Sequence, residues 1–281
     1  MDTITKSELD EIENSGFAWR ERGAVRALVC TPLAKLGFTN AFSTRPGGVS
    51  PLPQDALNLA GFVDDTAENI AENRRRFLAL FEGDWNLATA WQVHEASVVR
   101  VKNNHEYVND GERCDALTTD AAGVLVSVKT ADCVPVLLAD ARTGACAAVH
   151  AGWRGTLAEI LPRTLEQMNE DYGTRAADVH AAIGPAALAC CYEVGAEVVT
   201  AFQSRFNKTF FTETRAGHAL IDLHRANEAQ LTAQGVAPER IFRAPFCTMH
   251  HTDLFFSYRR EKQLHGRTGR LLAVIGRDDR G

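Results

Sequence analysis

The chain has 281 residues, of which 45% are hydrophobic and 23% charged, a composition close to that of ordinary globular domains. A domain of this size buries enough apolar surface to fold without disulfide or metal staples, so a metal site would serve chemistry rather than the fold. The net charge is −6 and no segment carries a dense Lys/Arg patch, so nucleic acid is not an expected partner.

The N-terminal segment is acidic and polar and has no apolar signal-peptide core. The longest apolar runs have the length of strands and are too short to span a membrane. The seven cysteines are odd in number and form no CxxC pair, which favours reduced thiols. We therefore expect a soluble, cytoplasmic protein without membrane association.

Residues 1–23 are predicted to form a polar N-terminal extension with little to pack. Residues 24–281 are predicted to form a single catalytic domain, because no linker, low-complexity stretch or internal repeat divides them. A helix is predicted over Thr66–Phe81, whose apolar residues recur at helical spacing. Asp65 is its expected cap, with Glu68 in the first turn.

Short apolar runs bounded by turn residues predict buried strands over Gly123–Val128, Val134–Ala139 and Cys146–His150. The turn between the last two has hairpin length, so these strands should pair antiparallel. The next apolar residues recur at helical spacing, but Pro162 lies inside the pattern and argues against one unbroken helix.

Further elements complete the predicted fold. They are strand Val179–Ile183, helix Val194–Phe206, strand Ala219–Leu223, helix Arg225–Ala233 and strand Leu271–Ile275. Helices alternate with strands, and one strand pair is a hairpin. This mixture favours an α/β fold with mixed sheets over an all-parallel doubly wound fold.

Reactive side chains interrupt the apolar strand signals at three places, His94, Cys133 and His150. Two imidazoles and a thiolate suit zinc or copper, and three protein ligands leave a position for water or substrate. The wide spacing of the three residues is unlike that of zinc fingers. From spacing alone, a hydrogen-bonded histidine and an inert buried cysteine are the more frequent alternatives.

Several longer motifs occur in one order along the chain. They are Phe42-Ser-Thr-Arg-Pro-Gly-Gly-Val-Ser50, Trp91-Gln-Val-His94, Thr130-Ala-Asp-Cys-Val-Pro-Val-Leu-Leu-Ala-Asp140, Val149-His-Ala-Gly-Trp-Arg-Gly155, Ile183-Gly-Pro185, Cys191-Tyr-Glu-Val194, Asp222-Leu223, Cys247-Thr248 and Phe256-Ser-Tyr-Arg-Arg260. The set resembles the laccase-domain family of bacterial YfiH-type proteins, formerly called multicopper polyphenol oxidases. The resemblance covers nearly the whole chain after its N-terminal extension.

The resemblance implies a single-domain layered α/β/β/α sandwich. It also implies an enzyme, a purine nucleoside phosphorylase acting on adenosine, inosine, guanosine and methylthioadenosine, with adenosine deaminase activity; these are glycosyltransferase and hydrolase reactions. The family's metal triad falls on His94, Cys133 and His150, with zinc as the expected metal and copper as the alternative. Purine nucleosides and phosphate are the expected small-molecule partners.

The sequence departs from the family pattern at two places. Glu95 stands where glycine commonly follows the first ligand, and Ala186 stands where many members have a cysteine after the Ile183-Gly-Pro motif. Any role of that cysteine cannot be carried over to Ala186.

Arginines in the matched motifs are predicted to bind substrate, because a guanidinium offers a planar fork for phosphate. These residues are Arg45, Arg154 and Arg259, and an ion pair or an exposed position is the alternative for each. Trp91 and Trp153 flank ligand motifs and are predicted either to stack on a purine or to pack in the core.

The ligand residues His94, Cys133 and His150 are also the predicted catalytic residues. Cys133 has a second interpretation, as a nucleophile with His150 as its base, although the second histidine favours a metal site. Asp132 is predicted to be structural, since neighbours on a strand point to opposite faces.

Two other functions remain open at this level. A copper-dependent polyphenol oxidase would need several copper centres, but the chain has nine histidines and no His-x-His pair. A nucleoside- or metal-binding module without turnover is the other alternative. Cys190, Cys191 and Cys247 are interpreted as packing residues.

Overall fold

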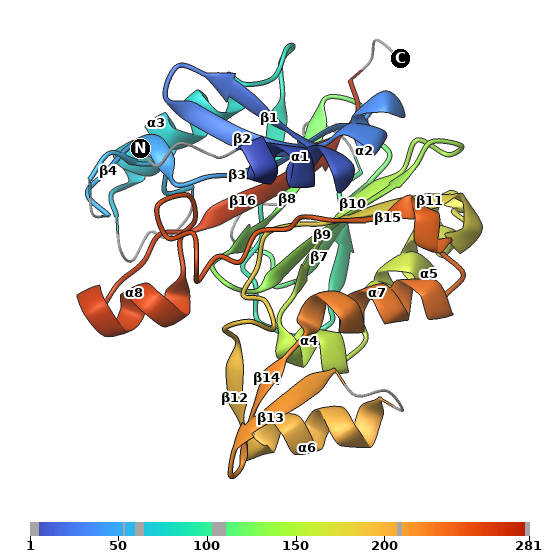
Figure 1. The fold of residues 1–281 in the computed structure, drawn as a ribbon. Helices are drawn as coiled ribbons and strands as arrows, with labels where there is room; N and C mark the ends of the chain where they lie inside the picture. Colours follow the sequence, from blue (N-terminus) through green and yellow to red (C-terminus); the bar gives the residue numbers. More distant parts are fainter. Residues whose placement is uncertain (1–5, 53, 60–64, 103–110, 207–209, 279–281) are drawn as a thin grey trace.

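The computed structural model describes residues 6–52, 54–59, 65–102, 111–206 and 210–278 (Figure 1). Two six-stranded sheets lie face to face. The first has the order β1-β2-β3-β16-β8-β5: Phe17–Arg22, Val25–Cys30, Thr39–Ser43, Leu271–Gly276, Val124–Thr130 and Asn86–Ala88. The second has the order β15-β11-β9-β10-β7-β6: Ile241–Arg243, Val179–Ile183, Val134–Asp140, Cys146–Ala151, Ala116–Thr119 and Val98–Arg100.

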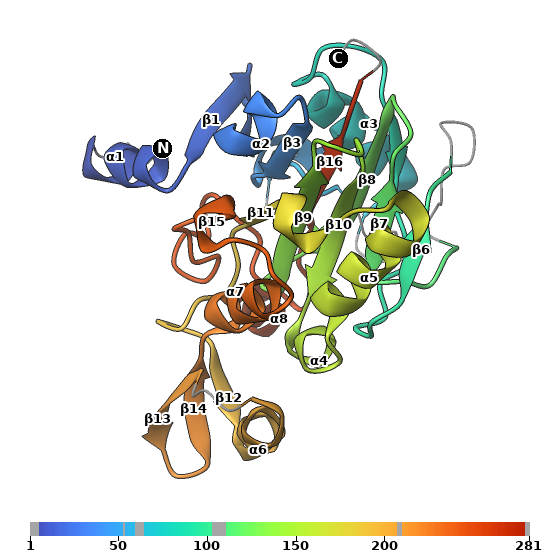
Figure 2. The same cartoon turned by 90° about the vertical axis from the view of Figure 1, so that its right-hand side faces the viewer.

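A third, small sheet has the order β12-β14-β13: Glu193–Gly195, His218–Ile221 and Phe211–Arg215. It stands out from one end of the sandwich together with α6 (Figure 2). Strand β4, Pro46–Ser50, lies outside the three sheets. The helices are α1 Lys6–Asn14, α2 Thr31–Lys35, α3 Ala67–Leu78, α4 Trp153–Leu157, α5 Ile160–Tyr172, α6 Ala196–Arg205, α7 Leu223–Ala233 and α8 Tyr258–His265, with 3-10 turns η1 Ala176–Asp178 and η2 Pro238–Arg240.

The central strands are apolar on both faces because both faces are covered. In β9, Leu137 points into the layer between the two sheets, whereas Val136 and Leu138 pack toward α5 and α7. In β16, Ala273 faces the second sheet and Val274 packs toward α3. Side chains that alternate between two buried faces produce the continuous apolar runs seen in the sequence.

Helix α3 covers the outer face of the first sheet, and α5 and α7 cover the outer face of the second (Figure 1). This arrangement is the predicted α/β/β/α sandwich, which is confirmed. The sheets are mixed: β9 and β10 form the predicted antiparallel hairpin, whereas β11 pairs with β15 in parallel.

The structure corrects one local prediction, the cap of α3, and confirms another, the interruption of the helix around Pro162. Helix α3 is capped by Thr66, whose hydroxyl accepts a hydrogen bond from the backbone of Asn69 (3.2 Å), and the prediction of Asp65 was wrong. The carboxylate of Asp65 instead accepts from the backbone N–H of Thr66 at 2.8 Å. The interrupted helix is two helices, since Glu159 adopts a left-handed backbone (φ 60°) and Pro162 lies in the first turn of α5. Proline is tolerated there because that turn needs no backbone donor.

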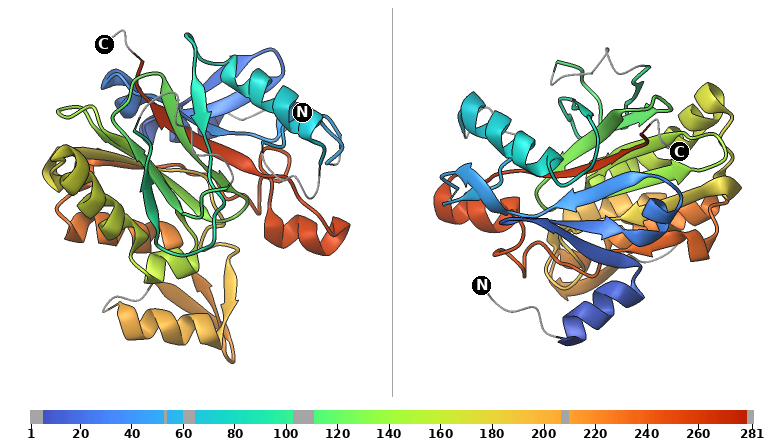
Figure 3. Two further views of the ribbon diagram at one scale, coloured as in Figure 1. Left: turned by 180° about the vertical axis from the view of Figure 1, so that it is seen from behind. Right: turned by 90° about the horizontal axis from the view of Figure 1, so that it is seen from above.

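The segment expected to be an extension packs more than its composition suggested. Strand β1 forms the antiparallel edge of the first sheet beside β2, and α1 precedes it at the periphery (Figure 3). Ile12 and Phe17 are both 1% exposed in the core cluster. The expectation of little packing was therefore wrong for residues 6–23, the described part of this segment. Ile12 and Phe17 anchor this otherwise polar stretch, and Trp19 packs against the same core cluster. Among the described residues, no helix is long and apolar enough to cross a membrane.

A buried histidine in α7 should make stability depend on pH. Burial lowers the pKa of His224 to about 4, while its Nε2 lies 3.0 Å from the carbonyl oxygen of Gly184. The unfolded chain, with a histidine pKa of about 6.5, takes up a proton that the folded protein excludes. Stability should therefore fall as pH drops from about 6.5 toward 4. Between pH 7 and pH 5 this group should contribute a loss of roughly 2 kcal/mol.

Urea unfolding at pH 7 and pH 5 checks this prediction. The variant His224→Gln should keep a side-chain donor for Gly184 and lose most of that pH-dependent difference. The exposed His265→Gln serves as the matched control and should retain it. If the free energy of unfolding changes equally between pH 7 and pH 5 in all three proteins, His224 is not the responsible group.

Candidate metal centre

Three loop and strand ends bring the predicted ligands together. His94 lies between β5 and β6, Cys133 lies in the turn between β8 and β9, and His150 lies in β10. Residues 150 and 135 are partners in the β9–β10 hairpin, which places the end of β10 beside the turn that carries Cys133. One donor atom from each ligand lies within 4.8 Å of the other two. The His94 and His150 rings meet edge to face, with centroids 4.9 Å apart.

A buried carboxylate fixes His150. The Nδ1 atom of His150 lies 2.8 Å from Oδ1 of Asp115, and the backbone N–H of His150 donates to the carbonyl oxygen of Asp115 at 2.7 Å. Both residues are almost inaccessible to solvent. Because Asp115 engages Nδ1, Nε2 is left as the donor atom for a metal, an arrangement common for metal-binding histidines.

The same carboxylate holds the loop of the first ligand. It accepts backbone hydrogen bonds from Val93 (3.3 Å), His94 (3.0 Å) and Glu95 (2.9 Å). His94 has a left-handed backbone with φ 62°, a conformation that a residue with a Cβ seldom adopts. Successive N–H groups in such a turn form a concave anion site, and the Asp115 carboxylate fills it.

The metal-free site carries opposite charges. Burial raises the pKa of Cys133, but the positive charge of His150 and hydrogen bonds from both histidines outweigh it, so the pKa falls to about 6. Burial lowers the pKa of His150, but the Cys133 thiolate and Asp115 outweigh it and raise the pKa to about 9. Burial also opposes ionisation of Asp115, yet its hydrogen bonds from His150 and the backbone hold its pKa below the usual range. A thiolate is the form of cysteine that binds metals or acts as a nucleophile.

Gly152 leaves the space that the ligands occupy. A Cβ atom at this position would lie 3.1 Å from Sγ of Cys133 and 3.5 Å from Cδ2 of His94. Gly152 is also the N-cap of α4, with φ −68° and ψ 172°. Its backbone is one that any residue can adopt, so the close approach of the ligands, and not conformation, requires glycine here.

The three ligands line a cavity of about 470 Å³. Its remaining lining residues are Trp91, Gln92, Lys129, Thr130, Ala131, Tyr258 and Arg270. His94 is exposed and His150 is buried, so the centre extends from the mouth of the cavity to its floor. The volume is in the range of pockets that bind small molecules and cofactors.

The structure does not bring Arg45 into this cavity. Its guanidinium is 2.5 Å from Glu261 and donates to the carbonyl oxygens of Thr252 (2.7 Å) and Leu52 (3.1 Å). It lines a separate cavity of about 310 Å³. The predicted substrate role of Arg45 stays a prediction, and the observed contacts are those of the ion-pair alternative.

Arg154 and Arg259 do not line the triad cavity either. The exposed guanidinium of Arg154 covers the ring of Trp153 at 4.1 Å. Arg259 donates to the carbonyl oxygen of Glu193 (2.8 Å) and lies over the Tyr192 ring (5.3 Å). Arg259 and Trp153 line a cavity of about 400 Å³ beside the small sheet, apart from the triad. Their substrate roles also stay predictions.

Asp132 has a structural position, as expected, but it lies in a turn with φ 84° and not on a strand, so the predicted reason was wrong. Its carboxylate accepts hydrogen bonds from the side chains of Thr248 (2.7 Å) and Ser257 (3.0 Å) and from the backbone of Arg259 (2.7 Å). It therefore fastens the start of α8 to the turn that carries Cys133, and it does not line the cavity.

Sequence reasoning missed four residues of the centre. Asp115, Lys129, Tyr258 and Arg270 were not singled out. Lys129 and Arg270 flank predicted strands, Tyr258 lies inside a matched motif, and Asp115 borders neither a predicted strand nor a motif. The available signal was a charged residue at the end of an apolar run, as in Arg270 before β16. Such residues are common at strand ends, so the signal alone did not select them.

The fold and the site together define a layered α/β/β/α protein with a centre of two histidines and one cysteine. A family described as Multi-copper polyphenol oxidoreductase laccase matches residues 39–278. The chain belongs to this family, which confirms the resemblance carried by the motifs.

Individual proteins agree with this assignment. A protein of Deinococcus radiodurans named Purine nucleoside phosphorylase is 40% identical over 243 residues, which cover 86% of this chain and 90% of the relative. The crystal structure of YlmD from Geobacillus stearothermophilus matches with a TM-score of 0.84 at 32% identity, covering 94% of this chain and 99% of that one. The Bacillus licheniformis protein YfiH matches with a TM-score of 0.84 at 27% identity, covering 92% and 99%.

The role of Asp115 in holding the ligands can be tested by Asp115→Asn. The amide keeps the shape of the side chain but turns a donor group toward backbone N–H donors and removes the charge that pairs with His150. We expect zinc affinity to fall by roughly 10- to 100-fold, the usual effect of losing a partner of a metal-binding histidine. Competition with a chromophoric chelator measures this. Asp120→Asn is the control, because Asp120 follows β7 as Asp115 precedes it and its carboxylate is more exposed. Unchanged zinc affinity in Asp115→Asn would refute the role of Asp115.

The close approach at Gly152 predicts that Gly152→Ala weakens metal binding while the fold survives. The added methyl group must displace the Cys133 sulfur, and overpacking of this kind costs about 1–3 kcal/mol, so zinc affinity should fall about tenfold or more. Gly195→Ala is a closely matched control, because Gly195 also caps a helix, with φ −84° and ψ 173°, and its Cβ would meet nothing within 4 Å. Equal zinc affinity in the two variants would contradict the steric argument.

Proposed function

We propose that this chain is a metal-dependent purine nucleoside phosphorylase that also deaminates adenosine. The observation that carries the proposal is the convergence of His94, Cys133 and His150 in a cavity that also holds aromatic and cationic side chains. The relative from Deinococcus radiodurans, whose name is Purine nucleoside phosphorylase, supports the same reaction class. The substrates we propose are adenosine, inosine, guanosine and methylthioadenosine.

The donor set suits zinc, with copper as the alternative. Two imidazoles and a thiolate are the ligands that these ions favour, and magnesium or calcium would require oxygen donors. When bound, such an ion supplies a localised positive charge and Lewis acidity beside the substrate. Three protein ligands leave one coordination position open, which is the usual arrangement of a catalytic zinc site.

Two exposed aromatic rings at the cavity are suited to hold the purine base. Trp91 is 52% exposed and Tyr258 is 48% exposed, and both line the cavity. Large rings left in water lose the burial that stabilises a folded chain, and a flat base can restore it by stacking. Of the two tryptophans considered from the sequence, Trp91 is the one that borders the triad.

Lys129 and Arg270 are the cationic residues that line the same cavity, and we propose that they bind phosphate. The backbone of Lys129 is clamped by the side chain of Gln92, through bonds of 2.7 and 2.8 Å. The guanidinium of Arg270 donates to the carbonyl oxygens of Thr268 (3.3 Å) and Gly269 (3.0 Å). These contacts orient Arg270, and an oriented guanidinium binds a phosphate with two parallel hydrogen bonds.

Phosphorolysis places three demands on such a cavity. A phosphate oxygen forms a bond to C1′ of the ribose, the bond from C1′ to the purine nitrogen breaks, and the released purine takes a proton. The cationic side chains hold the phosphate beside C1′, and the aromatic rings hold the base that departs. Holding two reactants in one geometry supplies much of the rate enhancement in reactions of this kind.

Deamination of adenosine exchanges the 6-amino group for a water oxygen and releases ammonia. The zinc-deaminase signature, H-x-E with P-C-x-x-C, does not occur in this sequence. We therefore assign this second reaction to the same triad, in a geometry different from that of the known zinc deaminases.

Phenol oxidation is a weaker candidate, although the family's description names it. Multicopper oxidation needs several copper ions held mostly by histidines. Within the described part of the chain, the groups suited to a metal are the triad and a second group that contains one histidine. A binding module without turnover is the remaining alternative, and steady release of ribose 1-phosphate would exclude it.

The proposal is tested by incubating zinc-loaded protein with each nucleoside, with and without phosphate, and measuring ribose 1-phosphate and free base. We expect phosphate-dependent product, and its loss in the double variant Cys133→Ala, His150→Ala. Unchanged product formation in that variant would remove the triad from the reaction. Oxygen uptake with a phenol after copper loading, in the absence of nucleoside turnover, would favour the oxidase instead.

A single substitution separates phosphate binding from metal binding in the same assay. Arg270→Gln should raise the KM for phosphate at least tenfold while leaving zinc content and nucleoside KM close to those of the parent protein, since a hydrogen bond to a charged group is worth about 1.5–3 kcal/mol. Arg142→Gln is a matched control, because that guanidinium pairs with Asp178 away from the cavity. A phosphate KM that does not change would argue against Arg270.

A further inference from the structure

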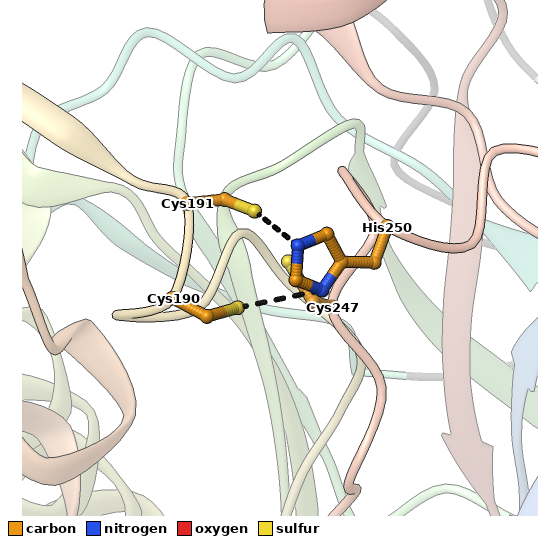
Figure 4. Close-up of side chains that lie close together, drawn as sticks. All are labelled: Cys190, Cys191, Cys247 and His250. Atoms are coloured by element: carbon orange, nitrogen blue, oxygen red, sulfur yellow. Dashed lines mark hydrogen bonds between the residues drawn. The ribbon is translucent and has the colours of Figure 1, made fainter.

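A second group of metal-binding side chains lies outside the triad. It consists of Cys190, Cys191, Cys247 and His250, and we refer to it as the Cys3His cluster. One donor atom from each residue lies within 4.8 Å of the other three. Figure 4 shows the thiols of Cys190 and Cys191 directed at the His250 ring, with the Cys247 sulfur close by. The interpretation of these cysteines as packing residues fits only Cys247, since Cys190 is exposed.

Two tight turns present the four side chains. In the first, the carbonyl oxygen of Leu188 accepts hydrogen bonds from the backbone of Cys191 (3.0 Å) and Tyr192 (2.9 Å). In the second, the carbonyl oxygen of Cys247 accepts from the backbone of His250 at 3.1 Å. Each turn reverses the chain over three residues. The second turn thereby brings the side chains of Cys247 and His250 to the same side of the backbone.

A short backbone pairing holds the two turns in register. The N–H of Thr248 donates to the carbonyl oxygen of Ala186 at 3.0 Å, and Ala186 and Cys247 form an isolated parallel bridge. The two cysteines of the first turn therefore face the Cys–x–x–His sequence of the second. Backbone hydrogen bonds therefore hold the four side chains near one another.

The side-chain contacts bring two thiols to the His250 ring, one at each ring nitrogen. Sγ of Cys191 is 2.8 Å from Nε2 of His250, and Sγ of Cys190 is 3.7 Å from Nδ1 of the same ring. The backbone N–H of Leu188 points at Sγ of Cys247 at 3.5 Å. A backbone N–H directed at sulfur stabilises a thiolate, the form in which cysteine binds a metal.

From this geometry we propose that the Cys3His cluster binds one zinc ion as a closed, structural site, separate from the triad. Zn²⁺ takes four ligands in a tetrahedron, with bonds of about 2.3 Å to sulfur and about 2.0–2.1 Å to nitrogen. Donors around such an ion lie roughly 3.5–3.8 Å apart, and the 4.8 Å spread of these atoms accommodates that arrangement with small side-chain rotations. Three soft thiolates and one imidazole select zinc over oxygen-seeking cations.

The ion has a definite structural task. It cross-links the segment after β11 to the segment before α8, far apart in sequence. Asp132 contacts the same two segments, since its carbonyl oxygen accepts from Ala187 (2.9 Å) and its carboxylate from Thr248 (2.7 Å). Because Asp132 immediately precedes Cys133, zinc in the Cys3His cluster stabilises the turn that carries a ligand of the triad. This role does not depend on the identity of the substrate.

The test begins with a protein whose triad is disabled, His94→Ala, Cys133→Ala, purified with reductant and without added chelator. We expect it to retain close to one zinc per chain by elemental analysis. Zinc-edge X-ray absorption should show three sulfur ligands and one nitrogen ligand at the distances given above. Absence of zinc, or a shell with one sulfur or none, would overturn the proposal.

Two further variants in that background assign the ion to the cluster. Cys190→Ser, His250→Gln changes the two exposed ligands, so the core stays intact, and zinc should be lost or released at least tenfold faster to a chelator. His251→Gln changes a neighbouring histidine outside the cluster and should keep the ion. Equal retention in both variants would overturn the assignment.

A disulfide is the main competing use of these thiols. Thiol titration of the denatured, zinc-containing protein should count every remaining cysteine as reduced. The contrary result is protein that contains no zinc and lacks two titratable thiols until reductant is added. That result would show that the cluster is a redox pair and would refute the metal site.

Discussion

The buried carboxylate of Asp115 holds two of the three triad ligands by different means. It binds the imidazole of His150 directly and stabilises the left-handed backbone of His94 through consecutive N–H groups. A charge in this position is costly unless hydrogen bonds surround it, and both carboxylate oxygens have such partners. The rest of the centre follows from this one residue: the tautomer of His150, the direction of the His94 ring, and the thiolate of Cys133 that balances His150.

Hydrophobic periodicity was enough to predict an α/β fold with mixed sheets, because both sheets are covered on both faces and their strands appear as continuous apolar runs. The layered α/β/β/α arrangement was implied by the family resemblance. It did not fix element ends. Thr66 and Asp65 are both good caps, and Thr66, whose backbone is extended, is the one that caps α3. Strand β1 was missed because its outward side chains are charged and its inward face offers little apolar surface, with Phe17 buried and Trp19 partly buried against the core. Local sequence gives little sign that a polar segment will form the edge strand of a sheet.

The triad was predictable from its motifs, but its surroundings were not. Strand order brings Arg270, which immediately precedes β16, beside a cavity lined by residues from the β5–β6 and β8–β9 connections, and no spacing rule encodes that proximity. Arg45 shows the reverse case. Its motif matched, yet burial against Glu261 gives its guanidinium a partner inside the protein. The convergence of the Cys3His cluster likewise depends on a backbone pairing between Ala186 and Thr248 that sequence alone does not reveal.

The position of β16 has a consequence for how the chain reaches this structure. The last strand lies in the middle of the first sheet, between β3 and β8, so its hydrogen bonds join residues more than a hundred positions apart. During synthesis β3 and β8 therefore wait with open edges until residues 271–276 emerge, whereas the strands of the second sheet are already available to pair. Assembly of the first sheet is a late, non-local event. Open edges of apolar strands are sites of intermolecular pairing, which makes this interval the one in which the nascent chain is most exposed to aggregation.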